Sequence, residues 1–471
     1  MSNTKPDISN LKGLIEDAKK AFLDNDDGPE DPTDYSQLRG RLEASRNKLP
    51  PLYRKIDVEP YIRTLDELGE TGFVSILLRD PTKQRVAGIM LDIAQAILQK
   101  GEKYKEIAID AFEEVVSDLY DGFLSAEDRR GVNPPDKETI PPLVKFSNYR
   151  AGPYTYPVNA TSIFGCQTGI VSLPPSHTRL ALIGWAALGH ETCGHDILHA
   201  DTGMFGELIT AVQTGLEQQG IKDGLPEYWS TRIDETASDC LGILNMGPMA
   251  GMAVLGYFRA LNLAFTGVPK LSNEGGTDEH PADILRGYLA ASTVGLLSFK
   301  EANSWAQTIE SETNKDLTTI VLEDTKIDAE IAKQSAKIVA STICTTKLKS
   351  IENHSFIEIQ DWHDSDQEIV NQLIAIMTTA NPLPSTLAAG IYAAHAVAAA
   401  IEAALAKDAD IPSIFGRMLA ILKMMHDKNS AWGPLFMTHR GNAFRDYFSR
   451  FFDPESYGQI EIRDTKSLRY K

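Results

Sequence analysis

Apolar side chains recur three and four positions apart along most of this chain. The spacing is clearest over residues 86–97 and 104–124, and it predicts an amphipathic helix in each segment. Further helices are expected over 178–199, from about residue 231, over 248–263 and from residue 281 onward. Most of the chain after residue 298 has the same spacing. The pattern predicts a mainly α-helical protein.

A few short runs with strand character interrupt this pattern. Residues 169–173, Gly-Ile-Val-Ser-Leu, stop at two prolines, and proline confines a strand to the edge of a sheet. We therefore expect an exposed edge strand there, just before the helix over 178–199. Two more strands are expected at 356–360 and 460–462.

The chain divides into three expected domains. Residues 1–145 are an N-terminal helical domain, 146–300 a core that combines helices with a small sheet, and 301–471 a mostly helical C-terminal domain. The acidic run over 24–31 is expected to be a solvated linker, because clustered like charges repel one another and favour hydration.

Charge limits the expected partners. The chain has 65 acidic and 46 basic residues and a formal net charge of -19, which repels phosphate backbones and anionic lipid. Neither nucleic acid nor a membrane is therefore expected as a partner. The alanine-rich segment 385–406 contains His395 and Glu402, and a charge at mid-bilayer is costly, so a buried helix is expected there.

The termini and cysteines suggest a compartment. The first residues lack the basic-then-apolar order of a signal peptide. The four cysteines, at 166, 193, 240 and 344, show neither a C-x-x-C pair nor the spacing of a disulfide framework. A reducing cytoplasm is expected. No pattern indicates the oligomeric state.

Two motifs about forty residues apart carry candidate chemistry. The first runs from His190 to His195 with the sequence His-Glu-Thr-Cys-Gly-His, and the second contains Glu235 and Asp239 at helical spacing. A hydrolytic Zn²⁺ needs three protein ligands and one open position. His190, His195 and Glu235 are the expected ligands. Glu191 is then the candidate general base, and Asp239 the carboxylate that orients a ligand histidine.

The spacing of the two histidines poses a geometric difficulty. Positions five apart in a regular α-helix point about 140° away from each other. His190 and His195 can share a metal only if the helix is distorted, and a π-type bulge over 192–194 would absorb the extra residue. Gly194 makes that distortion cheaper.

The paired motifs resemble those of the dipeptidyl peptidase III family, which has the same one-residue insertion in its zinc-binding helix. The resemblance implies His190, His195 and Glu235 as zinc ligands, Glu191 as catalytic base and Asp239 as the carboxylate behind a ligand histidine.

The order of elements over roughly 156–290 is similar to that of the soluble domain of CAAX prenyl proteases and HtpX-like peptidases. That order is a Gly-flanked strand, the His-Glu helix, Glu-x-x-x-Asp, then His280-Pro281 and Arg286. This resemblance implies a zincin-like α+β core in which the strand aligns an extended substrate, and His280 and Arg286 support the site. Both resemblances imply zinc-dependent hydrolysis of the gluzincin type.

Several assignments have alternatives. Glu191, His195 and His199 lie on one face of an undistorted helix and could replace the proposed ligand set. Glu191 would then be a ligand and no longer the general base. His280 could donate to an oxyanion or serve only to cap Pro281. The remaining side chains with two readings, contact with substrate or a purely structural role, are Arg286, Tyr288, Tyr154 and Tyr156.

The sequence therefore predicts a zinc metallopeptidase that hydrolyses a peptide or protein substrate with Glu191 as base. A bound peptide is expected to pair with the strand over 169–173. Two alternatives stay open: a zinc-bound scaffold without turnover, and a zinc hydrolase of a non-peptide amide or ester.

Overall fold

The computed structural model describes residues 5–125, 132, 135–137, 140–147, 152–222, 224–387 and 391–429. It is mainly helical, as the apolar spacing predicts. The N-terminal helices are α1 (Leu11–Phe22), α2 (Tyr35–Ser45), α3 (Pro51–Tyr53), the π-helix η1 (Arg54–Val58), α4 (Glu59–Arg79), α5 (Val86–Gly101) and α6 (Glu106–Ser125). The last two confirm the helices expected from 86–97 and 104–124.

The central helices follow a first group of strands. They are α7 (Val158–Thr161), η2 (Ser162–Phe164), η3 (Pro175–Thr178), η4 (Leu182–Ala186), the π-helix η5 (Gly189–Asp196), α8 (Ile197–Ala200), α9 (Met204–Gln218), α10 (Leu225–Thr231), α11 (Ile233–Met246), α12 (Pro248–Thr266) and α13 (Asp283–Val294). Helices α11 and α12 agree with the expected positions. Proline in the first turn of α12 costs no hydrogen bond there, and Gly267 ends the helix in a left-handed conformation (φ 78°).

The remaining helices are α14 (Ala302–Asn314), α15 (Ala329–Thr345), η6 (Lys349–Ile351), α16 (Phe356–Ile359), α17 (Asp364–Met377), α18 (Ala393–Leu405) and α19 (Ile411–His426). The strand expected at 356–360 is wrong. Ser355 and Glu358 form a reciprocal capping box around the first turn of α16, a local signal that favours a helix. The strand expected at 460–462 lies outside the described residues.

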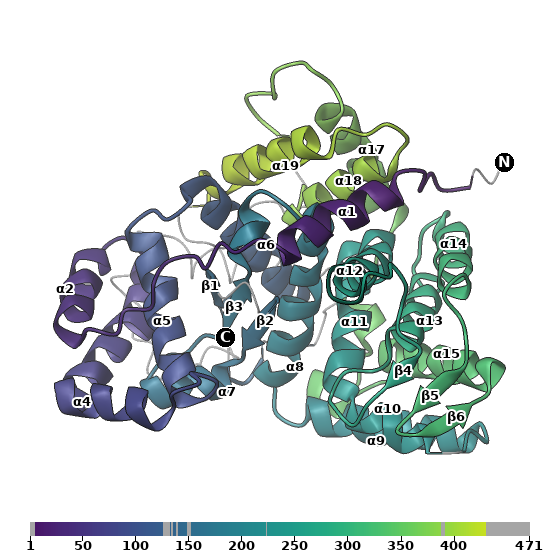
Figure 1. Cartoon of the computed structure of the whole chain (residues 1–471), viewed down its shortest axis with the longest axis horizontal. Helices are drawn as coiled ribbons and strands as arrows, with labels where there is room; N and C mark the ends of the chain where they lie inside the picture. The colour runs from purple at the N-terminus through teal and green to yellow at the C-terminus, as the bar shows by residue number, and fades with distance from the viewer. Residues whose placement is uncertain are drawn as a thin grey trace.

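A three-stranded sheet lies between α5 and α8 in the view of Figure 1. Its strands are β1 (Leu143–Phe146), β2 (Tyr154–Tyr156) and β3 (Ile170–Leu173), in the order β1-β3-β2. Strand β3 pairs parallel with β1 and antiparallel with β2, and all its residues are buried. The expectation of an exposed edge strand at 169–173 is therefore wrong, because β2 covers that edge. The edge strand is β2, which lies between Pro153 and Pro157.

A second small sheet, with the order β4-β5-β6, lies at the opposite end of the view from α4. It consists of β4 (Glu274–Gly275), β5 (Ile320–Leu322) and β6 (Thr325–Ile327).

The long helix expected over 178–199 is broken into short pieces. Ala181 has a left-handed conformation (φ 56°) and separates η3 from η4. The buried carboxylate of Asp17 in α1 accepts a hydrogen bond from the main-chain N–H of Leu182, 3.1 Å away, so the N-terminal helix caps the break. The next piece, η5, is π-helical over Gly189–Asp196, which confirms the bulge predicted around residues 192–194.

Close packing holds η5 against α11. A β-carbon on Gly189 would lie 3.2 Å from the Cα of Gly242, and one on Gly194 would lie 2.3 Å from the Cβ of Ser238. Two glycines of η5 thus allow the two helices to approach almost backbone to backbone. This contact positions the two motifs of the sequence side by side.

Helix α18 confirms the buried helix expected within 385–406. Its residues are almost all buried, and it packs among α6, α17 and α19, with α1 alongside (Figure 1). Among the described residues, no helix combines the length and the apolar character needed to cross a bilayer.

Candidate metal centre

The π-helix η5 places both histidines of the first motif on one face. Because π-helical hydrogen bonds join residues five apart, His190 and His195 lie one above the other. Their Nε2 atoms are 3.0 Å apart, and the two rings are nearly perpendicular. In an α-helix the inserted residue would turn the two histidines away from each other. In the π-helix it places both on the same face.

Glu235, in the first turn of α11, completes the group. Its Oε2 lies 3.3 Å from His190 Nε2, and its Oε1 lies 3.3 Å from His195 Nε2. A tetrahedral Zn²⁺ with bonds of about 2.0 to 2.1 Å places its ligand atoms about 3.3 to 3.4 Å apart. Both histidine–glutamate distances agree with that spacing, each through a different carboxylate oxygen, and the 3.0 Å between the two Nε2 atoms is slightly shorter. The side chains of residues 190, 195 and 235 converge as the sequence predicts.

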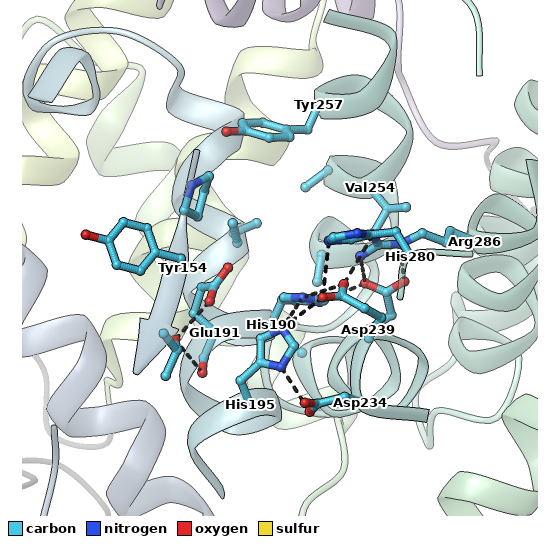
Figure 2. Close-up of a pocket in the computed structure, with 18 of the residues that line it drawn as sticks. Tyr154, His190, Glu191, His195, Asp234, Asp239, Val254, Tyr257, His280 and Arg286 are labelled. Carbon is cyan, nitrogen blue, oxygen red and sulfur yellow. Dashed lines mark hydrogen bonds and ion pairs between the residues drawn. The ribbon is translucent and has the colours of Figure 1, made fainter. Parts of the chain in front are cut away.

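The carboxylates behind the two imidazoles decide which nitrogen faces the centre. His190 Nδ1 lies 2.9 Å from Asp239 Oδ1, and His195 Nδ1 lies 3.0 Å from Asp234 Oδ1 (Figure 2). A carboxylate accepts, so each Nδ1 carries a hydrogen, and in the neutral imidazoles each Nε2 would present a lone pair to the other. Two lone pairs at this distance repel each other unless a cation lies between them. Two imidazoles and a carboxylate suit Zn²⁺.

Arg286 in α13 holds the outer carboxylate. Its Nε and Nη2 donate to the two oxygens of Asp239 at 2.7 Å, and its Nη1 lies 3.4 Å from Glu235 Oε2. The guanidinium is buried and packs on the ring of Phe258. Arg286 thus orients Asp239, which in turn orients His190.

These charges shift the pKa values of the group. Burial alone would lower the pKa of His190, but hydrogen bonds with Asp239 and Glu235 outweigh it and raise the pKa to about 9. Burial would raise the pKa of Glu235, but contacts with His190, His195 and Arg286 keep it below its usual range. Without a metal, the site therefore favours a proton on the histidine pair, in the place that suits a metal cation.

Glu191 lies beside the ligand group and is not part of it. Its carboxylate Oε2 accepts a hydrogen bond from Thr155 Oγ1 at 2.8 Å, and its carbonyl oxygen lies 3.2 Å from the same hydroxyl. Thr155 belongs to the edge strand β2. A carboxylate that lines the same hollow as a candidate ligand group, without belonging to that group, has the placement that a general base would need.

The group opens into a hollow of about 480 Å³. Figure 2 shows Tyr154 and Glu191 on one side, Tyr257 and Val254 on another, and His280 and Arg286 close to the ligands. The part of the hollow beside His190, His195 and Glu235 is polar. The part lined by η4 and α12 is largely apolar and includes Ile183, Ala186, Ala253 and Val254.

The other residues singled out in the sequence have mixed placements. His280 lies at the rim, more than half exposed, with Nε2 3.3 Å from Glu235 Oε1. Tyr288 does not line the hollow, and its hydroxyl donates to Asn314. His199 Nε2 lies 3.0 Å from Asp234 Oδ2, so the alternative ligand face of residues 191, 195 and 199 is not assembled.

Two side-chain contacts of the site are not predicted by the sequence. The contact of Asp234 with His195 and His199 had a signal, because Asp234 precedes Glu235 in the second motif. The contact of Thr155 with Glu191 has none, because the residues are 36 positions apart and the Tyr-Thr-Tyr segment around Thr155 has no apolar strand pattern.

A second group with possible ligand atoms consists of Asp110, His426 and Asp427. Lys100 Nζ lies 2.7 Å from Asp110 Oδ1 and 3.0 Å from His426 Nε2. An ammonium group therefore already provides the positive charge in this group.

No family model, curated protein or solved structure matches this chain. The chemistry of the centre rests on its own geometry.

Proposed function

We propose that this protein is a zinc-dependent hydrolase that cleaves peptide bonds. The observation that carries the proposal is the combination of a three-ligand group with a separate, hydrogen-bonded carboxylate. His190, His195 and Glu235 have the spacing of zinc ligands, and Glu191 faces the same hollow. A purely structural zinc has four protein ligands and needs no base.

Zn²⁺ held by these residues would polarise a substrate carbonyl and acidify water. Glu191 would take a proton from the attacking water and pass it to the leaving amine. Thr155 occupies Oε2 of this carboxylate, so Oε1 is the atom that would carry the proton. His280 Nε2 at the rim would donate to the oxygen of the reacting carbonyl as negative charge develops there.

The proposed binding mode for substrate uses β2. Strand β2 lines the hollow through Tyr154 and Thr155 and has β3 as its described neighbour on one side only. An extended peptide could add to the other side by main-chain hydrogen bonds, which favour a peptide without strict sequence choice. A short mixed sheet beside a metal-binding helix is also what supports a zincin-like core.

Metal analysis and a peptide library would test the proposal. Purified protein should bind about one Zn²⁺ per chain and cleave peptides, and a chelator should abolish cleavage until zinc is restored. Glu191→Gln should bind zinc as the parent does and lose turnover by about 100-fold or more.

Each alternative gives a different result. A zinc-loaded protein that cleaves neither peptides nor small esters and amides would be a scaffold. Cleavage of esters or non-peptide amides alone would keep the hydrolase and reject the peptide substrate. Parent-like turnover by Glu191→Gln would show that the base is assigned wrongly.

A further inference from the structure

The edge strand β2 has two faces with different contacts. Side chains alternate along a strand, so Tyr154 and Tyr156 point to one face and Thr155 to the other. The Thr155 hydroxyl contacts the side chain and the main chain of Glu191 in η5. The opposite face carries a buried charged group. A three-residue strand can form at a sheet edge without a contact to Glu191 and without a buried charge, so both the contact and the charge need an explanation.

The buried charge is Lys145 of β1. Its side chain is fully buried, and its Nζ lies 2.8 Å from Asp92 Oδ1 and 2.8 Å from Tyr154 Oη. Ser147 Oγ also accepts from it. The Tyr154 hydroxyl in turn donates to Asp92 Oδ2 at 2.7 Å. We refer to Lys145, Asp92 and Tyr154 as the strand anchor.

The strand anchor has a cost in folding free energy, since burying a lysine and an aspartate removes both charges from water. The attraction between Lys145 and Asp92 offsets that cost, and the pair joins α5 and β1 to the first residue of β2. The main-chain pairing of β2 is weak by comparison, because its register with β3 covers only three residues. The anchor therefore fixes a strand that its own ladder would hold loosely.

The anchor contacts β2 through the Tyr154 hydroxyl, and Thr155 is the next residue along the strand. A carboxylate can rotate about its terminal torsion, and its reach to a water molecule changes with that rotation. The hydroxyl of Thr155 restrains one oxygen of Glu191 and leaves the other toward the hollow. How strongly Thr155 restrains Glu191 therefore depends on how rigidly β2 is held.

We propose that Thr155 is the positioning residue for Glu191 and that the strand anchor holds Thr155 in place. The inference rests on the proposed function for its kinetic consequences, but the hydrogen bond can be measured without turnover. The inference also gives β2 a role in the substrate-free protein. The strand with which a peptide would pair is the same strand that orients Glu191. Binding and chemistry would therefore depend on one element.

Kinetics of Thr155→Val and Thr155→Ser would test the proposal. Valine has the shape of threonine without the hydroxyl, and it should lower kcat by about 10- to 100-fold with KM changed less than about twofold. Serine keeps the hydroxyl and should restore most of kcat. Zinc content should equal that of the parent in both. Thr325→Val, at an exposed position of strand β6, is the matched control and should leave kcat unchanged.

A thermal unfolding cycle provides the readout that needs no substrate. The change in Tm caused by Thr155→Val should be smaller in a Glu191→Ala background, because the carboxylate partner of the hydroxyl is gone and only the main-chain carbonyl of residue 191 remains. Tyr154→Phe removes the hydroxyl that links the strand to the anchor, and it should lower kcat alone but add little to Thr155→Val.

Three results would overturn the inference: parent-like kcat in Thr155→Val, a Thr155→Ser enzyme as impaired as Thr155→Val, or additive Tm changes with Glu191→Ala. Absence of all peptide cleavage by the parent protein would reject the proposed function instead, and the unfolding cycle would still decide whether Thr155 and Glu191 are coupled.

Discussion

Gly194 of η5 lies against Ser238 of α11 so closely that a β-carbon on Gly194 would be 2.3 Å from the Ser238 Cβ. Two positions beyond Gly194 the π-helix ends, and three positions before Ser238 lies Glu235. The separation of these two residues therefore sets how closely the histidine pair approaches its carboxylate.

Gly194→Ala should separate η5 from α11, lower Tm by several degrees and weaken zinc binding, because neither backbone can yield without moving the helix it belongs to. Calorimetry with and without zinc would measure both effects. Gly206→Ala is the control, because a β-carbon on Gly206 would meet no neighbouring atom within 4 Å, and alanine favours the helix α9. Equal Tm changes in the two variants would contradict the packing account.

The carboxylates behind the imidazoles should govern metal affinity. Asp234→Asn and Asp239→Asn should each weaken zinc binding by about 10- to 100-fold, because a neutral amide holds the Nδ1 hydrogen less strongly and makes Nε2 a poorer donor. Competition with a chromophoric chelator would measure this. Asp324→Asn, on the exposed turn between β5 and β6, should bind zinc like the parent.

Asp239→Asn should also destabilise the fold more than Asp234→Asn. Asp239 is nearly completely buried and bonded twice to Arg286, whereas the Asp234 side chain is about one-third exposed. Replacing Asp239 leaves a buried guanidinium with less compensation. Comparable unfolding midpoints for the two zinc-free variants would argue against that role for Arg286.

Zinc should stabilise the folded chain, because its ligands come from two segments that only the folded state brings together. A free zinc concentration of 100 times Kd should add about 2.7 kcal/mol to the free energy of unfolding. His195→Ala should abolish the effect, and Glu191→Gln should preserve it. Loss of the zinc effect in Glu191→Gln would place Glu191 among the ligands.

Asp118 of α6 should make stability depend on pH. Burial raises its pKa to about 7, although a hydrogen bond from the Ala393 N–H opposes the shift. The folded state thus holds a proton that the unfolded chain releases at the usual carboxyl pKa, so stability falls as pH rises from about 4 to about 7. The neighbouring carboxyl groups of Glu114 and Asp121 are also buried and have raised pKa values.

Asp118→Asn should therefore raise the free energy of unfolding at pH 8 and change it little at pH 4, because the amide stays neutral throughout and its oxygen can still accept from Ala393. Urea unfolding across this pH range would measure the difference. Greater destabilisation by Asp118→Asn at pH 8 than at pH 4 would reverse the sign and reject the assignment.

Local signals in the sequence predicted several helices and the two motifs whose side chains His190, His195 and Glu235 converge in the structure. Periodic apolar positions define α5, α6, α11 and α12, and the one-residue excess between His190 and His195 required the π-helix that η5 forms. These features depend on neighbours within a few turns, so a single sequence carries them. The division into three domains stays a prediction.

The sheet could not be predicted in the same way. Strand β3 has a clear apolar signal, but whether it lies at an edge depends on what pairs with it, and β2 is a Tyr-Thr-Tyr segment without such a signal. The partner of Glu191 was missed for the same reason. Tertiary pairing of short segments, as between Thr155 and Glu191 or Lys145 and Asp92, leaves no periodic trace in the chain.

The shape of β2 has a consequence for self-association. An open sheet edge invites any extended chain, including another copy of the same protein, and long exposed edges lead to aggregation. Here the edge is three residues long and ends at Pro153 and Pro157, which lack main-chain N–H donors. Only a short stretch of another chain can form main-chain hydrogen bonds with this edge. The edge can therefore bind an extended peptide without nucleating aggregation by repeated strand pairing.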